Sequence, residues 1–337
     1  MTLGNGIKKN RYLYFTAKLL LLLFIVFLFD FTIGKTLSYF YFKQECGRQY
    51  RATYAIEKTT ADVLIFGSSR AYHQYVPGVI EDRLKQSCYN TGSPGQFLLY
   101  NYATLKAILK RYSPKLIILD VSPGDLRVEK ESYERLSFLL PYYRKHEEIR
   151  PVVDLKSPLE KFKLLSSIYA FNSSFLMIAG GNSEYFKKKA TDIKGYKPLF
   201  GIWNGPIEIG NSEEYKIDST KTNIFTDFIK DCRQAKTELF IVCSPSYAKF
   251  NHTEYSISII EKIAKEQNTG FIDFTNDTFF TNHPNLFDDP GHLNDNGAKI
   301  FSNKLIDTIG RFFSKNASVN PVGTKTLSGF SKKDPAS

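Results

Sequence analysis

The sequence predicts an α/β fold: a three-layer α/β/α sandwich around a parallel five-stranded sheet, preceded by one transmembrane helix. Short apolar runs alternate with amphipathic stretches along the body of the chain, which is typical of strands alternating with helices. Most of these runs are apolar on both faces, as expected for a parallel sheet covered by helices on each side. A long apolar segment near the amino terminus predicts the transmembrane helix.

The apolar segment covers residues 12–33, and its centre, Leu19–Phe29, is an unbroken run of Leu, Phe, Ile and Val. A helix of this length rises about 33 Å, which matches the hydrocarbon core of a membrane. Lys18 and Asp30 lie close enough to its two ends to reach the polar interfaces. The segment is therefore interpreted as a single membrane anchor.

Basic residues before the anchor set its expected orientation. Lys8, Lys9 and Arg11 precede it, and no equally basic segment follows directly, so residues 1–11 are expected in the cytoplasm and the body outside it. A cleaved signal peptide is the alternative, although residues 31–38 offer no cleavage site of small residues.

The body is divided by its hydrophobic pattern. Strands are predicted at residues 62–66, 88–91, 115–121, 238–243 and 270–274. Helices are predicted at residues 76–86, 96–111, 221–235, 254–267 and 295–313.

These elements imply one catalytic domain at residues 61–314, after a polar spacer at residues 34–60. Residues 126–220 lack a clear strand rhythm and are interpreted as an insertion. Residues 315–337 are polar and rich in Gly, Ser and Lys, so we expect a disordered tail.

Composition and charge narrow the function. With 42% hydrophobic and 23% charged residues, the chain is globular in composition. Of the formal charge of +11, residues 1–35 contribute +4 and residues 316–337 contribute +2, which leaves +5 for the body. No cluster of Lys and Arg with interleaved aromatic residues stands out, so no nucleic acid is expected as a partner. An anionic envelope polymer or lipid surface fits the charge better.

The cysteines give no sign of a metal site. Cys46, Cys88, Cys232 and Cys243 form no CxxC pair, and no His lies at zinc-ligand spacing, so no metal and no cofactor are predicted. Disulfides are permitted but not implied. Cys88 and Cys243 lie in predicted strands, where buried free thiols are expected.

The first predicted strand leads directly into Gly67-Ser68-Ser69-Arg70-Ala71. A serine at the carboxyl end of a parallel strand lies in the crevice where such sheets bind ligands, which makes Ser69 a candidate nucleophile. The alternative is a tight turn with a helix-capping serine.

A second segment, Asp289-Pro290-Gly291-His292, lies just before the last predicted helix. One loop can then deliver a general base, His292, and the carboxylate that fixes its tautomer, Asp289. Asn294 is expected to cap the helix that follows. The sequence thus predicts a triad of Ser69, His292 and Asp289.

With these two segments the chain resembles the SGNH (GDSL) hydrolase superfamily, whose sheet is flavodoxin-like. Gly67-Ser68-Ser69 stands where that family has Gly-Asp-Ser, and Asp289-x-x-His292 matches its last motif in full. The likeness covers about residues 61–314 in element order. It implies that Ser69, and not Ser68, is the nucleophile.

The resemblance also implies an oxyanion hole. Its donors would be the amides of Ser69 and of Gly92, which follows the second strand. The family often places an Asn after the third strand, but residues 120–125 contain none, so the hydroxyl of Ser122 is the substitute candidate.

A single anchor before this fold is similar to the envelope acyl-transfer proteins of the superfamily, such as the teichoic acid D-alanylation type, which work beside a membrane-bound O-acyltransferase. The resemblance implies an extracytoplasmic serine esterase or O-acyltransferase, at the periplasmic or cell-surface side of the cell membrane. Its substrates would be acyl (acetyl-like) esters of cell-envelope glycans. A catalytically silent scaffold, or a glycan-binding partner of such an O-acyltransferase, is the alternative.

Other site interpretations remain open. An α/β-hydrolase would need a further Gly at position 71, and it takes its Asp and His from loops far apart in sequence. A metal site could be formed by His283, Asp288, Asp289 and His292. His73, His146 and His252 are expected at the surface. Arg70 could meet an anionic substrate or form a structural ion pair.

Overall fold

The computed structural model describes residues 3–189, 191–210, 215–250 and 254–319. Its centre is a parallel five-stranded sheet with the strand order β2-β1-β3-β5-β7. The strands are β1 (Val63–Phe66), β2 (Cys88–Asn90), β3 (Leu116–Asp120), β5 (Glu238–Cys243) and β7 (Gly270–Asp273). All five lie within a residue or two of the predicted ranges, and the predicted α/β fold class is confirmed.

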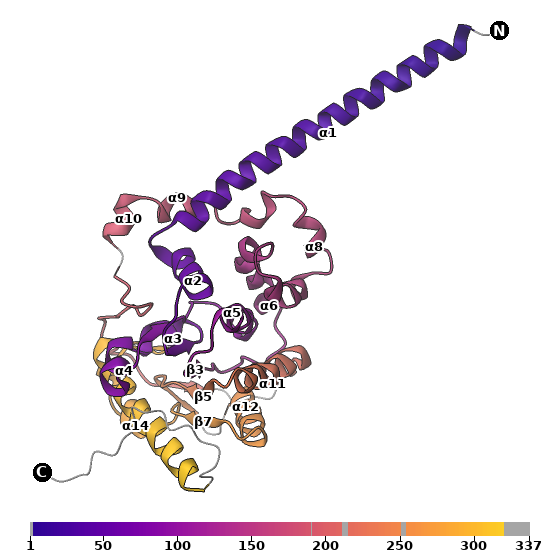
Figure 1. Ribbon diagram of the computed structural model, residues 1–337. Coiled ribbons are helices and arrows are strands. Elements are labelled where there is room, and N and C mark those ends of the chain that lie inside the picture. The colour runs from indigo at the N-terminus through magenta and orange to yellow at the C-terminus, as the bar shows by residue number, and fades with distance from the viewer. Residues whose placement is uncertain (1–2, 190, 211–214, 251–253, 320–337) are drawn as a thin grey trace, which may run out of the picture.

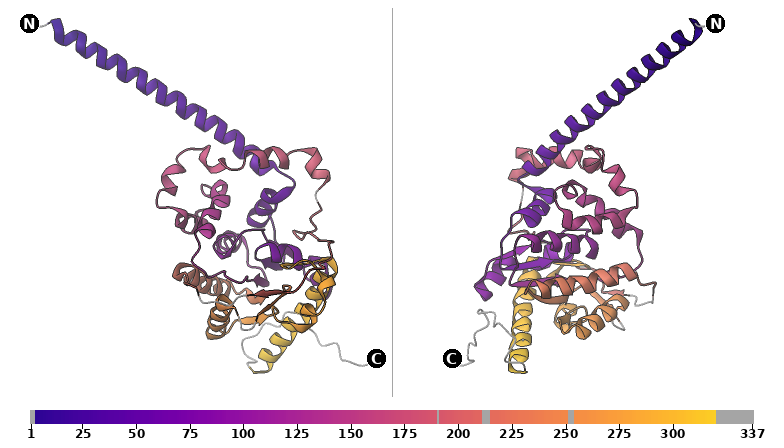
Figure 2. Two further views of the ribbon diagram at one scale, coloured as in Figure 1. Left: turned by 180° about the vertical axis from the view of Figure 1, so that it is seen from behind. Right: turned by 45° about the vertical axis from the view of Figure 1, so that its right-hand side comes forward.

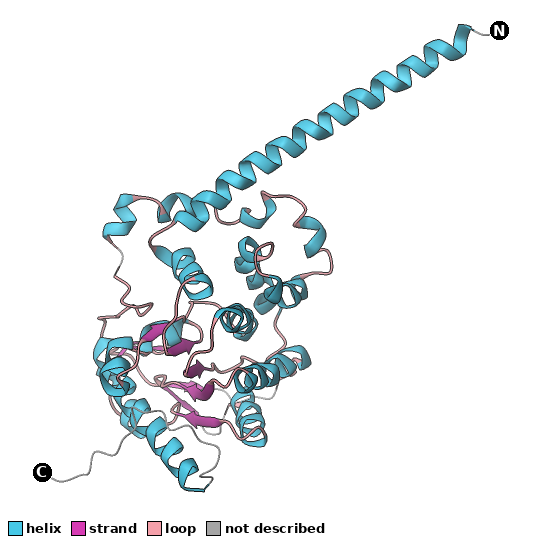
Figure 3. Cartoon of the chain, in the orientation of Figure 1, coloured by secondary structure: helices cyan, strands magenta, loops and turns pink. Residues whose placement is uncertain are grey.

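All strand pairs of this sheet are parallel, and helices cover both of its faces (Figure 3). This arrangement agrees with strands that are apolar on both sides. Leu64 and Phe66 point into one core, whereas Val63 and Ile65 point into the other. The first core is covered by α2 (Gly47–Glu57), α5 (Leu98–Arg111), α11 (Ser219–Gln234) and α12 (Tyr255–Glu266). The second is covered by α3 (Ser69–Gln74), α4 (Pro77–Leu84), α13 (Thr278–Thr281) and α14 (Asp295–Val319).

The chain reverses its direction across the sheet between β1 and β3. β2 lies on one side of β1, and β3 with the later strands lies on the other. In sheets of this kind, ligands bind outside the carboxyl ends of the strands at such a switch point. The segments after β1 and β3 begin with Gly67 and Val121, so they meet at this position.

The amino-terminal helix α1 (Leu3–Lys43) projects from the globular body (Figures 1 and 2). Among the described residues, it is the one helix that is long and apolar enough to cross a membrane, and its apolar centre is not covered by the rest of the chain. The residues expected to form a spacer are largely helical, because α1 continues to Lys43 and α2 begins at Gly47.

The segment interpreted as an insertion contains short helical turns in place of regular layers. An antiparallel bridge between Arg127 and Ile217 brings its two ends together. Its helices are α6 (Lys130–Glu134), η1 (Arg135–Tyr142), η2 (Glu147–Ile149), α7 (Arg150–Val153), η3 (Asp154–Lys156), α8 (Glu160–Lys163), η4 (Tyr169–Phe171), α9 (Phe175–Gly181) and α10 (Glu184–Lys188).

Three further short features complete the fold. β4 (Glu208–Gly210) pairs in parallel with β6 (Ala248–Phe250), and β8 (Phe287–Asp289) forms a hairpin with β9 (His292–Leu293), after η5 (Pro284–Leu286). The last helix continues to Val319, beyond the predicted end at residue 313, and the rest of the predicted tail lies outside the described residues. The four cysteines are all buried and free.

Candidate active site

The turn after β1 presents two serines at the carboxyl end of the sheet. Gly67 has a φ of +146°, a conformation that L side chains rarely adopt. A Cβ at this position would also come within 2.7 Å of the Ala71 Cβ and 2.9 Å of the Asp120 Cβ. Glycine is therefore needed for the chain to pass from β1 into α3, whose first residue is Ser69.

His292 lies within hydrogen-bonding distance of both Ser69 and Asp289. The Ser69 Oγ is 2.8 Å from the His292 Nε2, and the His292 Nδ1 is 2.9 and 3.0 Å from the two carboxylate oxygens of Asp289. A carboxylate only accepts hydrogen bonds, so Nδ1 carries the proton and Nε2 accepts the bond from the Ser69 hydroxyl. The structure thus brings together the three residues predicted as a triad, 223 positions apart in the case of Ser69 and His292.

The β8–β9 hairpin holds both His292 and Asp289, and it is anchored by backbone contacts. Asp289 pairs with His292 across the Pro-Gly turn. The Gly291 amide donates to the Asp289 Oδ1 at 2.7 Å, which fixes one carboxylate oxygen. The Tyr247 amide donates to the Pro290 carbonyl, also at 2.7 Å.

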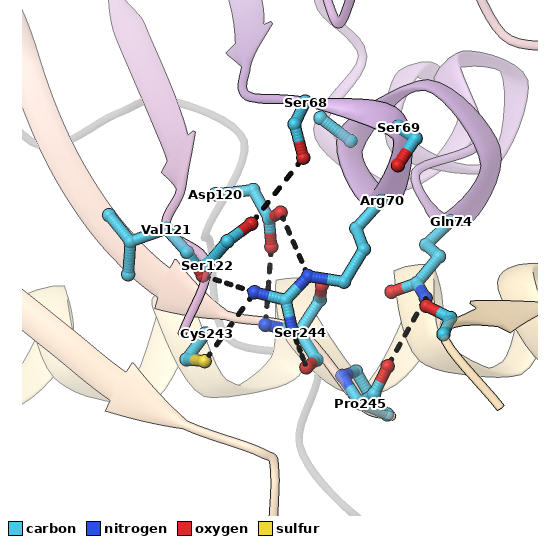
Figure 4. A network of polar contacts seen from close by, with 12 residues as sticks. Ser68, Ser69, Arg70, Gln74, Asp120, Val121, Ser122, Cys243, Ser244 and Pro245 are labelled. Atoms are coloured by element: carbon cyan, nitrogen blue, oxygen red, sulfur yellow. Dashed lines mark hydrogen bonds and ion pairs between the residues drawn. The ribbon is translucent and has the colours of Figure 1, made fainter. Parts of the chain in front are cut away.

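Gln74 ties this hairpin to the helix that carries Ser69. Its Nε2 donates to the Gly291 carbonyl and to the Pro245 carbonyl, each at 3.1 Å, and its side chain is fully buried. The contact with Pro245 is visible in Figure 4. Because Gln74 and Ser69 lie on the same short helix, this contact fixes the hairpin relative to the serine.

His73 lies beside His292, which corrects its predicted place at the surface. The two rings meet edge to face, with centroids 5.4 Å apart. The His73 Nδ1 donates to the Lys197 carbonyl at 2.8 Å, and burial lowers the pKa of His73 to about 4. The ring is therefore neutral at pH 7, and it adds no positive charge next to His292.

The predicted oxyanion donors meet different environments. The buried amide of Gly92, which the sequence predicts as a donor, donates to the Asn90 Oδ1 at 2.9 Å in this structure. Ser122 lies near the turn that follows β1, with its Oγ 3.4 Å from the Ser68 Oγ. The amide of Ser122 donates to the Asp125 carboxylate. Ser69 is the first residue of α3, so its own amide has no partner within the helix.

Arg70 is part of the buried structure and does not face a ligand. Its guanidinium pairs with Asp120 at 3.7 Å and donates to the carbonyls of Val121 and Ser244 (Figure 4). The Asp120 carboxylate also accepts from the Tyr75 hydroxyl at 2.7 Å. The ion pair therefore connects the ends of β3 and β5 beneath the two serines, as the structural alternative for Arg70 predicted.

Contacts decide two of the remaining predictions, those for Asn294 and His146. Asn294 caps α14, because its Oδ1 accepts from the Gly297 amide at 3.1 Å. His146 is mostly buried between Glu57 and Glu148, so its predicted surface position is wrong. His252 lies outside the described residues, and within the described part of the chain no group of His, Cys, Asp and Glu side chains is arranged to hold a metal ion.

Sequence reasoning missed His73 and Gln74. His73 follows Ser69 by four residues, which places both on one face of a helix, and this spacing could have identified it. The short helix α3 itself was not predicted, because six residues give no periodic pattern. Gln74 carries no such signal, since its partners Pro245 and Gly291 come from distant loops.

Among solved structures, the chain is similar to two esterases. The psychrotrophic esterase EstA from Pseudoalteromonas sp., in a structure inhibited by monoethylphosphonate, is 11% identical with a TM-score of 0.38, covering 75% of this chain and 98% of that one. The acetyl xylan esterase AlAXEase is 13% identical with a TM-score of 0.38, covering 73% and 99%. No family model and no curated protein sequence matches the chain. These similarities carry no argument about chemistry, which rests on the site geometry.

Proposed function

We propose that the chain is a membrane-anchored, extracytoplasmic serine esterase or O-acyltransferase of the SGNH type, in which Ser69, His292 and Asp289 act as the catalytic triad. The observation that carries the proposal is the 2.8 Å contact between the Ser69 Oγ and the His292 Nε2, with Asp289 on the opposite ring nitrogen. A nucleophile, a base and a carboxylate that fixes the base form the arrangement that activates a serine hydroxyl for acyl transfer.

In the first half-reaction, the Ser69 Oγ attacks the carbonyl carbon of an ester while His292 takes the hydroxyl proton. The C–O bond to the leaving alcohol then breaks, and His292 returns the proton to that alcohol. An acyl group is left on Ser69. In the second half-reaction, His292 deprotonates water or an acceptor hydroxyl, which takes the acyl group and regenerates the Ser69 hydroxyl.

The oxyanion that forms in each half-reaction needs donors near Ser69. The Ser69 amide, free of an intrahelical partner at the start of α3, is one donor. The Ser122 hydroxyl, which reaches the Ser68 side of the same turn, is the second donor in this proposal.

The apolar part of α1 supports a membrane location for this chemistry in our proposal. Residues 12–33 form the span, and Lys8, Lys9 and Arg11 hold the amino terminus in the cytoplasm. The domain at residues 61–314 then lies outside the cytoplasm. The proposed substrates are acyl esters of cell-envelope glycans, as in the envelope acyl-transfer proteins that the chain resembles, with a membrane-bound O-acyltransferase as the candidate partner.

A fluorophosphonate probe tests the proposal, because it reacts covalently with activated serines. The full chain in detergent is labelled and digested, and the labelled peptide is mapped. We expect label on Ser69, no label in Ser69→Ala or His292→Ala, and unchanged labelling in Ser68→Ala, the matched control. Turnover of a short-chain acyl ester should follow the same pattern. Label on Ser68, or equal turnover in all four proteins, would falsify the assignment.

A catalytically silent scaffold that binds a glycan or an O-acyltransferase is the second candidate function. The engagement of the Gly92 amide by Asn90 favours it, because one expected oxyanion donor is missing. The two candidates differ in two results: a scaffold leaves Ser69 unlabelled, and it releases no alcohol from any ester.

A further inference from the structure

The insertion exposes large apolar side chains that have no cover within the described part of the chain. We call six of them the apolar rim: Leu159, Phe162, Leu165, Phe175, Leu176 and Met177. Leu176 is 87% exposed and Leu165 is 76% exposed. Single exposed apolar residues are common, but a group of this kind on neighbouring turns marks an interaction surface.

The apolar rim surrounds the point where α1 leaves the domain. α9 and η4 contact α1 near its carboxyl end, and α8 lies further out on the side of η4 (Figure 1). Ser166 and Ser167 donate to the Asp30 carboxylate, the Ser167 amide at 2.6 Å. Further along α1, the Asn182 Nδ2 donates to the Phe40 carbonyl at 2.8 Å. The insertion therefore holds α1 from Asp30 onward.

These contacts fix the level of the apolar rim relative to the membrane span. Asp30 is the first charged residue after the unbroken apolar run Leu19–Phe29, so it lies close to the outer end of the proposed span at residues 12–33. Leu165 directly precedes Ser166, which bonds Asp30. The exposed surface of the apolar rim thus continues the exposed apolar surface of α1 at the depth where the span ends.

The charges near the apolar rim indicate which lipids it would contact. Residues 155–189 contain six Lys against Glu160 and Glu184, a net charge of +4. The Glu160 carboxylate is fully buried and pairs with Lys156 and Lys163. Lys187 pairs with Glu184 and also with Glu45 of the preceding segment, so the net charge of the group is +3 when Glu45 is counted, and it stays positive. Apolar side chains interleaved with lysines are typical of segments that lie in the interface of an anionic bilayer.

We propose that the apolar rim inserts into the headgroup region of the outer leaflet and that the adjacent lysines bind its anionic lipids. This inference rests on the proposed membrane span of α1 and adds to it a second attachment. With two attachments, the domain cannot rotate freely on a tether, and its active site is held at a constant height above the membrane. The substrates within reach are then esters at the membrane surface.

Depth-dependent quenching tests this placement. The full chain is reconstituted in vesicles of phosphatidylcholine, with and without phosphatidylglycerol, that contain lipids carrying a nitroxide quencher near the headgroup. An environment-sensitive fluorophore is attached at Leu165→Cys or Leu176→Cys in the apolar rim, at Phe24→Cys in the span, and at Ile300→Cys on α14, at the far end of the domain (Figure 1). The unmodified protein, whose four cysteines are buried, gives the background.

We expect a blue shift and strong quenching at Leu165 and Leu176, with stronger quenching when phosphatidylglycerol is present, and no quenching at Ile300. Quenching at Phe24 without quenching at either position of the apolar rim would overturn the inference while leaving the span intact, and it would point to a protein partner as the cover. Loss of quenching at Phe24 as well would overturn the span, and with it both proposals about the membrane.

Discussion

The ring of His73 packs edge to face against the ring of His292, with 5.4 Å between the two centroids. Burial keeps His73 neutral, since its pKa is lowered to about 4. A second imidazolium at this position would oppose the positive charge that His292 acquires when it takes the proton of Ser69. His73 therefore supports the proposed general base by packing against it without a charge.

This environment predicts a pH dependence of stability. The pKa of His73 is below its unfolded value of 6.5, so between about pH 6.5 and pH 4 the unfolded chain binds more protons than the folded one. The contribution of His73 to stability is present above this range and is lost as the pH falls through it. We expect the difference in Tm between pH 7 and about pH 4.5 to be smaller in His73→Phe, which keeps the aromatic packing and cannot titrate.

Thermal unfolding of the full chain in detergent at the two pH values, followed by circular dichroism, measures this difference. His283→Phe is the matched control, because His283 is exposed and contacts Phe279 rather than the site. It should retain the pH dependence of the unmodified protein. An unchanged pH dependence in His73→Phe would show that this ring is not held in the neutral form by the fold.

The two adjacent acids of the hairpin are expected to differ sharply in their effect on turnover. Asp289 accepts from the His292 Nδ1, whereas Asp288 accepts from the Gly201 amide. Asp289→Asn removes the negative charge and favours the wrong tautomer of His292, so kcat for a short-chain ester should fall by about 10⁴-fold. Asp288→Asn can still accept from Gly201 and should change kcat by less than about 10-fold.

Steady-state kinetics on the purified variants, with unfolding temperatures measured in parallel, checks this pair. Equal losses of kcat in Asp289→Asn and Asp288→Asn would mean that Asp289 only stabilises the hairpin. Restoration of activity in Asp289→Glu, which keeps the charge, would support the role in holding His292.

The sheet could be predicted from the sequence because each core strand is an apolar run buried on both faces, as in β1 and β3. The proximity of Ser69, His292 and Asp289 could be predicted because these residues follow β1 or precede the last helix, at the same end of the sheet. The hydrogen bond from the Gly92 amide to Asn90 could not be predicted, because it depends on how the side chain of Asn90 is turned in the folded protein. Neither a strand pattern nor a motif records that choice.

The insertion shows the other limit of sequence reasoning. Its helices have only three to eight residues and are held by individual contacts, such as those of Asp30 with Ser166 and Ser167, so no periodic pattern marks them. The long apolar segment was evident in the sequence, but its exit from the domain beside η4 and α9 depends on these long-range contacts. The apolar rim could be recognised only once the fold was known.

The hydroxyl of Ser122 provides a direct test of the oxyanion proposal. If it donates to the oxyanion, Ser122→Ala should lower kcat by about 10²-fold with little change in KM, because the bond forms mainly in the transition state. Ser122→Thr keeps a hydroxyl and should retain most of the activity. Equal kcat in the unmodified protein and Ser122→Ala would exclude this hydroxyl as a donor and leave the Ser69 amide as the donor nearest the nucleophile.

The buried pair of Arg70 and Asp120 is expected to be strongly coupled. Both side chains are almost fully buried, so removing either one leaves a charge without its partner in the interior. Arg70→Met should therefore lower the free energy of unfolding by about 3–5 kcal/mol, and the double variant Arg70→Met with Asp120→Asn by less than the sum of the two single losses. Arg83→Met, which breaks an exposed pair with Asp307, should lower the free energy of unfolding by less than about 1 kcal/mol.

Urea unfolding of all four variants measures these differences. Additive losses at Arg70 and Asp120 would mean that the two charges are stabilised separately, by the Val121 and Ser244 carbonyls on one side and by Tyr75 on the other.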